Sequence, residues 1–159
     1  MEAGEKAEVK VVPLVKTIAV NFGYQAGFNT VYAYDEHTNS YLRSYGNGEP
    51  HLAYTCPAGL GQVAPQKDCN SAIQVAPKVV VAMVVEESTA WDNYHQNITA
   101  IGSGKAYVFQ NGTATEAIWS KASAKAQIEF KDAAGNIISF TPGQLWIAAI
   151  PNGVGSIKY

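Results

Sequence analysis

The stretch Gly102–Lys121, GSGKAYVFQNGTATEAIWSK, decides the fold class, because it contains the signals of a complete β-hairpin. Apolar and polar residues alternate on both sides of Asn111-Gly112, which is the preferred pair for a two-residue type I′ turn with positive φ at both positions. Gly102 and Gly104 permit a bend, a bulge or a close backbone approach, and we interpret them as a glycine hinge at the entrance of the hairpin.

The same pattern of short alternating runs between turn residues recurs along the chain. No segment has a convincing helical period, although 121–126 could form one turn of helix. We therefore expect an all-β fold, a single antiparallel sandwich or barrel-like domain of about nine or ten short strands built from hairpins. The expected strands are 16–22, 30–34, 40–45, 78–86, 105–110, 113–120, 126–131, 136–141, 145–150 and 154–159, preceded by a short valine-rich strand before residue 13.

One of these runs differs from the others, because it does not alternate. Residues 79–85 read VVVAMVV, and such a continuous β-branched run predicts a central strand that is buried on both faces. The run is far shorter than the roughly 20 residues that a membrane-spanning helix needs.

The length and composition are those of one folded domain. The chain has 159 residues, of which 47% are hydrophobic and 15% charged, with a net charge of −2. We expect a leader or linker over 1–12 and one domain over 13–159. Glu2, Glu5 and Lys6 do not form the basic and apolar regions of a signal peptide. No basic stripe is present, so we expect no nucleic-acid partner.

The two cysteines, Cys56 and Cys69, bracket a stretch rich in Gly, Pro, Ala and Gln that is expected to form a long loop over 55–77. This arrangement favours a disulfide in an oxidising compartment, and two reduced thiols are the alternative. A zinc site is disfavoured, because no second close pair of Cys or His completes four ligands.

Few residues are candidates for chemistry. His37 and His95 lie in polar loop sequences, whereas His51 follows Gly-Asn-Gly-Glu-Pro and is the best candidate for a site. The sequence contains no metal-binding motif and offers no reason to expect a cofactor. Ser103 lacks the spacing of a nucleophile elbow, and its glycine neighbours lack the Lys-Ser/Thr of a phosphate loop.

Arg43 is the only arginine, beside ten lysines, and it falls in the middle of an expected strand. It could pair across the hairpin with a carboxylate such as Asp35 or Glu36, or it could bind an anionic ligand. Trp119 and Trp146 fall within expected strands and are more often core residues than ligand platforms, whereas Trp91 is expected to be exposed.

An ordered series of short motifs resembles a known family. The motifs are Tyr32-Ala-Tyr34-Asp35, Tyr41-Leu-Arg43, Gly48-Glu-Pro-His51, Gly102 to Phe109, Trp119-Ser, and Thr141-Pro-Gly-Gln-Leu-Trp146-Ile. Over roughly residues 16 to 151 the series is similar to the C-terminal domain of YerB-type bacterial lipoproteins, a family of unknown function. In the family pattern an acidic residue stands two places after the histidine, where this chain has Ala53, and the long cysteine loop resembles an insertion.

The resemblance implies a longer, lipid-anchored protein outside a bacterial membrane, with an N-terminal domain as partner. It implies no known reaction. Two functions then compete: an extracytoplasmic binding or scaffold domain of the cell envelope, or a hydrolase acting on envelope glycan or peptide. The candidate ligand-binding residues are Asp35, Tyr41, Arg43 and His51. The hydrolase requires Arg43, His51 and a carboxylate such as Asp35 to converge on one cleft.

Overall fold

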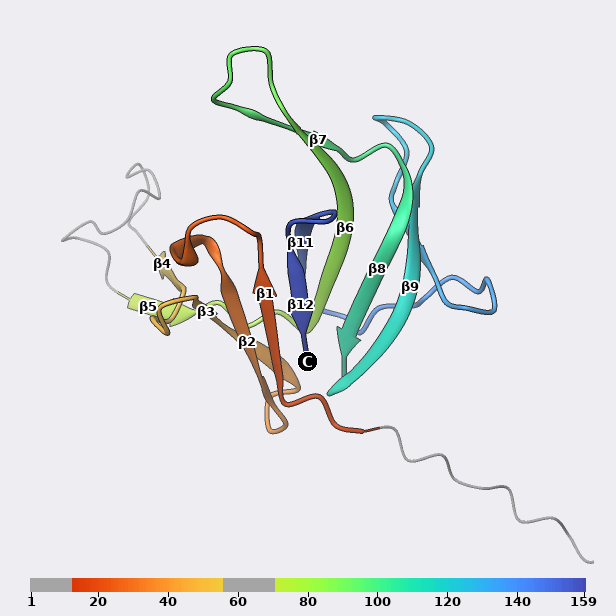
Figure 1. The fold of residues 1–159 in the computed structure, drawn as a ribbon. Coiled ribbons are helices and arrows are strands. Elements are labelled where there is room, and N and C mark those ends of the chain that lie inside the picture. The colour runs from red at the N-terminus through yellow and green to blue at the C-terminus, as the bar shows by residue number, and fades with distance from the viewer. Residues whose placement is uncertain (1–12, 56–70) are drawn as a thin grey trace, which may run out of the picture.

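The computed structural model describes residues 13–55 and 71–159, and it is built almost entirely of β-strands (Figure 1). Twelve strands and one turn of 3-10 helix, η1 (Ala26–Phe28), are present in these residues, and none of them contains an α-helix. The all-β prediction is therefore confirmed, with more strands than the nine or ten expected. The described residues contain no helix that is long and apolar enough to span a membrane.

The strands form three sheets, none of which closes into a barrel, so the architecture is sandwich-like. In the first sheet the order is β12 (Ser156–Lys158), β1 (Thr17–Asn21), β2 (Thr30–Asp35) and β3 (Ser40–Tyr45). In the second it is β10 (Glu129–Lys131), β9 (Thr113–Lys121), β8 (Gly102–Gln110), β6 (Val79–Thr89) and β11 (Leu145–Pro151), with β7 (Gln96–Thr99) on the far end of β6. A ribbon of β4 (Leu52–Thr55) and β5 (Ser71–Gln74) forms the third.

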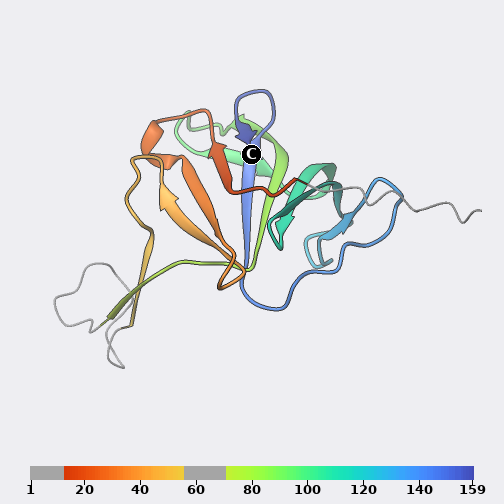
Figure 2. The same ribbon diagram turned by 90° about the horizontal axis from the view of Figure 1, so that it is seen from below.

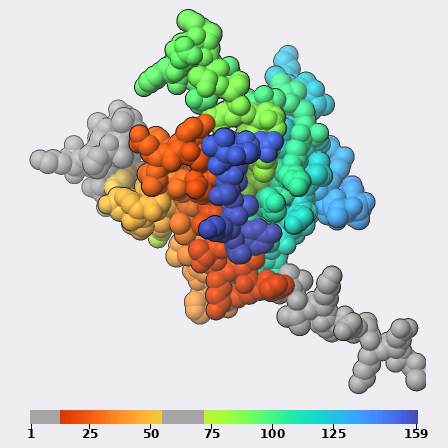
Figure 3. Space-filling model, viewed as in Figure 1, coloured from red at the N-terminus to blue at the C-terminus, as the bar shows by residue number. Residues whose placement is uncertain are grey.

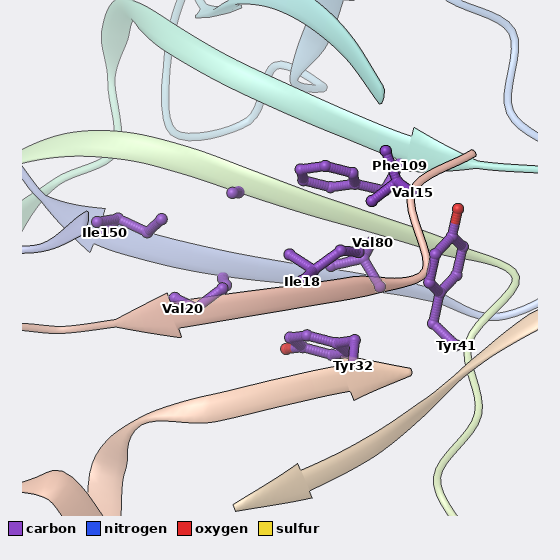
Figure 4. Close-up of a cluster of buried hydrophobic side chains, with 10 residues drawn as sticks. Val15, Ile18, Val20, Tyr32, Tyr41, Val80, Phe109 and Ile150 are labelled. Carbon is purple, nitrogen blue, oxygen red and sulfur yellow. The ribbon is translucent and has the colours of Figure 1, made fainter. Parts of the chain in front are cut away.

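The apolar run of β6 is buried on both faces, as its sequence predicts. Val80 and Ala82 pack into a cluster between the two large sheets (Figure 4), whereas Val81 and Met83 pack into a second cluster on the opposite face. A fully buried side chain of this kind stabilises the fold by about 1.5–3 kcal/mol. The apolar residues follow one another without alternation because neither face of this strand is exposed to water.

Not all strand pairing follows the expected hairpins. β11 pairs with β6 in parallel, from Leu145 opposite Val79 to Pro151 opposite Val85, so the sheet is not purely antiparallel. The connection from β9 back to β11 also departs from the prediction, since the expected hairpin of 126–131 and 136–141 is reduced to the short β10 and one isolated bridge between Lys131 and Ile137. Residues 121–126 form no helix: Lys121 ends β9, and a turn with flanking bends follows it.

The Asn111-Gly112 turn has the predicted geometry, with φ values of 53° and 68°. It also joins the two large sheets: the N–H of Gly112 donates to the hydroxyl of the buried Tyr41 at 3.1 Å, and the N–H of Val15 donates to the carbonyl of Gly112 at 2.7 Å. Asn39 donates to the Asn111 side chain at 2.9 Å. The turn is therefore a contact between sheets as well as a hairpin end.

The glycine pair is not a hinge outside the hairpin, because Gly102 and Gly104 lie within β8 and pair with β9. The close-approach interpretation holds at Gly104, where a Cβ would lie 2.6 Å from Nε1 of Trp119. That indole nitrogen donates to the carbonyl of Val84 at 2.7 Å. Gly104 therefore lets the Trp119 ring cross β8 and reach β6.

The β6–β7 hairpin projects from the body of the molecule (Figure 3), and Trp91 in its loop is 94% exposed, as expected. The expected disulfide of Cys56 and Cys69, and the strand expected before residue 13, lie outside the described residues.

The Asn111-Gly112 turn yields a matched pair of substitutions. We expect Gly112→Ala to destabilise the fold more than Gly135→Ala, which has a similar φ of 85° but open space where its Cβ would stand. The Gly135 variant should lose about 1 kcal/mol of unfolding free energy from backbone strain alone, and the Gly112 variant about 3 kcal/mol, since its Cβ would also meet the Tyr34 ring at 2.6 Å. Urea denaturation measures both, and equal losses would contradict the packing of this turn.

Candidate functional site

Arg43 lies at the centre of an aromatic cluster. Its guanidinium carbon lies 4.4 Å from the centroid of the Trp146 ring and 5.4 Å from that of Tyr45, within the range of cation–π attraction. Its Nη1 is hydrogen-bonded to Nδ1 of His51. The His51 ring packs against both aromatic rings, with centroids 5.1 Å from Tyr45 and 5.6 Å from Trp146. These four side chains, Arg43, Tyr45, His51 and Trp146, are called the arginine cluster below.

Three separate segments bring the arginine cluster together. Arg43 is on the buried face of β3, directly opposite Tyr32 in the register with β2. The chain after β3 folds back, and the N–H of His51 donates to the carbonyl of Arg43 at 3.0 Å. Trp146 comes from β11, in the other large sheet. Backbone hydrogen bonds fix each of the three segments. The position of each side chain therefore follows from its own segment and not from the contacts within the cluster.

His51 is held in its neutral form. Burial lowers its pKa below the usual value, and the positive charge of Arg43 lowers the pKa further. A neutral imidazole can accept the hydrogen bond that the guanidinium donates at Nδ1. The arginine therefore fixes the tautomer of His51, whose proton must sit on Nε2.

Arg43 is only 9% exposed, and no carboxylate of residues 13–55 and 71–159 forms an ion pair with it. The ion pairs in the described part of the chain join other residues, and Nε of Arg43 is buried without a hydrogen-bond partner there. A buried guanidinium ordinarily has its charge paired and its N–H groups satisfied. Among the described residues, the arginine cluster thus contains a positive charge without an acidic partner and at least one donor without an acceptor.

Asp35 does not join the cluster. Its carboxylate accepts hydrogen bonds from the backbone N–H of His37 at 3.0 Å and from the hydroxyl of Thr38 at 2.7 Å, within the loop between β2 and β3. These bonds, the Thr38 hydroxyl first, lower the pKa of Asp35. The interpretation of Arg43 as the partner of Asp35 or Glu36 is therefore wrong, and the hydrogen-bonding of Asp35 is that of a turn residue.

Tyr41 shares a face of β3 with Arg43 but lies in the core, where its hydroxyl accepts the Gly112 N–H. Burial raises the pKa of Tyr41 to about 12, so the phenol stays protonated. Its position is that of a structural residue between the sheets. Of the four candidate residues, the structure brings together Arg43 and His51 and leaves Asp35 and Tyr41 elsewhere.

A groove of about 470 Å³ opens beside the arginine cluster. Arg43 and Trp146 form part of its lining, Phe22 and Phe28 come from the segment between β1 and β2, and Ile98 comes from β7. The other lining residues are Tyr24, Glu87, Gln96, Ile147, Ala148, Ala149 and Pro151. The groove therefore joins an apolar surface to a buried positive charge.

Trp146 and Tyr45 belong to the arginine cluster, although no motif in the sequence indicates them as site residues. Trp146 was expected in the core because it falls in an apolar strand, but only its position beside Arg43 makes it part of a site. His37 and His95 are exposed loop residues, as expected, and His95 is bonded to Asp92 at 2.5 Å in the β6–β7 loop. The described residues contain no group of three or more His, Cys, Asp or Glu side chains placed to hold a metal ion.

The pKa of His51 makes stability depend on pH. Because the folded pKa is below the unfolded value of about 6.5, the unfolded chain binds more protons between these two values, and stability must fall as the pH drops below about 6.5. We expect the unfolding free energy to rise from pH 5 to pH 7 more steeply in the parent than in His51→Gln. Urea denaturation across this range is the measurement, and identical slopes would show that His51 is not buried beside a positive charge.

The comparisons with known proteins agree with the motif series. The chain matches, over residues 18–147, the family described as "Protein of unknown function (DUF3048) C-terminal domain". No curated protein matches it. A solved structure, the YerB protein from Bacillus subtilis, superposes with a TM-score of 0.63 at 20% sequence identity, over 90% of this chain and 43% of that protein. The resemblance to YerB-type C-terminal domains is confirmed, and the chain belongs to the DUF3048 C-terminal domain family.

Proposed function

We propose that this domain is a binding module of the bacterial cell envelope, and that its ligand places an anionic group against Arg43 and apolar groups in the adjoining groove. The observation that carries the proposal is the buried guanidinium, whose Nε has no acceptor and which has no carboxylate partner in the described part of the chain. An anion would compensate this charge, since a charge-assisted hydrogen bond is about twice as strong as a neutral one. The aromatic and aliphatic walls favour a ligand with an apolar part.

The cellular setting of the proposal rests on the family resemblance. The chain corresponds to 43% of the YerB protein, which leaves room in a full-length protein for the N-terminal domain that the name of the family implies. We infer a lipoprotein displayed outside the membrane through an anchor beyond this sequence, with that N-terminal domain as a partner. The two cysteines of the 56–70 segment support an oxidising location.

The cysteine pair gives a direct test of that location. β4 and β5 pair with Thr55 opposite Ser71, so the two residues that flank the segment with both cysteines lie side by side. We expect Cys56 and Cys69 to be bonded, with a stabilisation of about 3 kcal/mol in the chain-entropy model. Thiol titration of denatured, non-reduced protein should find no free thiol, and two free thiols would remove this support for an extracytoplasmic site.

The alternative, a hydrolase acting on envelope glycan or peptide, needs a carboxylate that works with His51. Asp35 does not supply it, because it is occupied in its own turn. Glu87 also lines the groove, but its carboxylate accepts a hydrogen bond from the hydroxyl of Tyr24. This distribution favours binding over hydrolysis.

An anionic aromatic dye, 8-anilinonaphthalene-1-sulfonate, has the chemistry that the groove is proposed to bind. Its fluorescence should rise on titration with the folded domain, and Arg43→Gln should weaken binding by about tenfold to a hundredfold, because loss of a charge-assisted hydrogen bond costs about 1.5–3 kcal/mol. Arg43→Lys should retain part of the affinity.

Two exposed residues provide matched controls for the dye. Phe28, which is 64% exposed, lines the groove, whereas Ile137, 63% exposed, lies outside it. Phe28→Ser should weaken binding and Ile137→Ser should not. Equal dye binding by the parent, Arg43→Gln and Phe28→Ser would refute the groove as the binding site.

A further inference from the structure

The outer edge of β11 presents unpaired backbone groups. The N–H of Val79 donates to the carbonyl of Gln144, and the N–H of Asn152 donates to the carbonyl of Val85. In a parallel pair, every second residue of a strand forms its backbone hydrogen bonds with the neighbouring strand, and the residues between them point their N–H and C=O groups to the opposite side. The even-numbered residues of β11 therefore bond to β6, and Leu145, Ile147 and Ala149 point their N–H and C=O groups away from it.

These outward groups are open. β11 is the last strand of its sheet, on the side that faces the first sheet (Figure 2). Within residues 13–55 and 71–159, no hydrogen bond to the backbone of Leu145, Ile147 or Ala149 comes from outside the β6–β11 pair. Unpaired strand edges are sites at which a further strand can add.

The open edge runs along the groove. The groove is lined by the consecutive β11 residues 146–149, whose side chains point alternately to opposite faces of the sheet. Consecutive residues can line one groove only if the strand edge itself faces it. Arg43 lines the same groove, so backbone groups and a positive charge that have no partner among the described residues lie beside each other.

We propose that this groove binds an extended peptide, which adds to β11 as a further strand and places a carboxylate against Arg43. The inference deepens the proposed binding function and rests on it. From Leu145 to Ala149 the edge spans about 13 Å at 3.3 Å per residue, which matches about five residues of a bound strand. Backbone hydrogen bonds supply affinity in this mode, and side-chain pockets supply specificity.

The walls of the groove define the peptide. Arg43 contacts Trp146. The peptide residue whose side chain lies on the same face of the sheet as Trp146 is therefore expected to be Asp or Glu, or to be the carboxyl terminus of the peptide. Phe22 and Phe28 favour apolar or aromatic neighbours. Glu87 also lines the groove and favours a single acidic group over an acidic run. Pro151, which has no N–H, ends the edge.

A peptide fits these features better than a glycan, because the edge offers donors and acceptors at strand spacing. A bound strand is chosen over a second copy of the domain because the aromatic and aliphatic lining and Arg43 offer contacts for the side chains of a peptide. Glycan binding and self-association are therefore the competing outcomes of the experiment.

The first measurement is amide hydrogen exchange of the free domain by NMR. The amides of Ile147 and Ala149 should exchange at least about tenfold faster than those of Ala148 and Ile150, which bond to β6. Equal protection at the four positions would show that the edge is covered and would overturn the inference.

The second measurement uses a phage-displayed library of random heptapeptides, followed by synthesis of the selected sequences. Selected peptides should alternate, contain one acidic residue, and slow the exchange of Ile147 and Ala149. N-methylation at the alternate residues that face β11 should weaken binding about tenfold or more, while N-methylation at the other residues leaves the affinity within about threefold. Ile147→Pro should abolish binding, because it removes an outward N–H and no bond to β6, whereas Ile147→Ala should retain it.

Several outcomes would overturn the inference: no selected peptide, binding that is insensitive to N-methylation, binding of chitotetraose in place of peptides, or a dimer that closes the β11 edge. If dye binding still depends on Arg43 in any of these cases, the proposed binding function stands and only the peptide assignment fails. Loss of the Arg43 dependence as well would remove both.

Discussion

The structure depends on a strand that must avoid water on both sides. β6 has seven consecutive apolar residues, Val79 to Val85, and a strand of alternating side chains can bury them only between two layers. One layer is the four-stranded sheet, and the other is formed by β9, β10 and the segment that follows them. β8 and β11 occupy the two edges of β6, so the strand most in need of burial becomes the centre of the fold.

The arginine cluster depends on how the two large sheets are joined. The hydroxyl of Tyr41 accepts the Gly112 N–H and so fixes β3 against the β8–β9 turn. Arg43, two residues further along the same face, is thereby directed at Trp146 on β11. Because apolar burial around Tyr41 stabilises this part of the fold, Arg43 can be held in place without an acidic partner among the described residues.

The parts of this architecture that the sequence predicts are those with local causes. The positive φ values at Asn111 and Gly112 and the double burial of β6 follow from neighbouring residues. The pairing of β11 with β6 joins segments separated by the whole β7–β10 region, and no local pattern encodes it. Arg43 and His51 are close in the sequence and could be predicted as site residues. Trp146 could not, because it reaches them only through the pairing of β11 with β6. Asp35 was misassigned because an aspartate at the start of a hairpin loop serves either as a cap of the turn or as an ion-pair partner, and only the side-chain hydrogen bonds distinguish the two.

The position of the β11 edge has a consequence for colloidal behaviour. A free strand edge at the rim of a sheet allows molecules to join edge to edge and to grow into aggregates. Here the edge borders a groove that is also lined by Phe22 and Phe28 and by residues of the β6–β7 hairpin. A strand bound in this groove would cover the edge and so remove the site at which such aggregates grow.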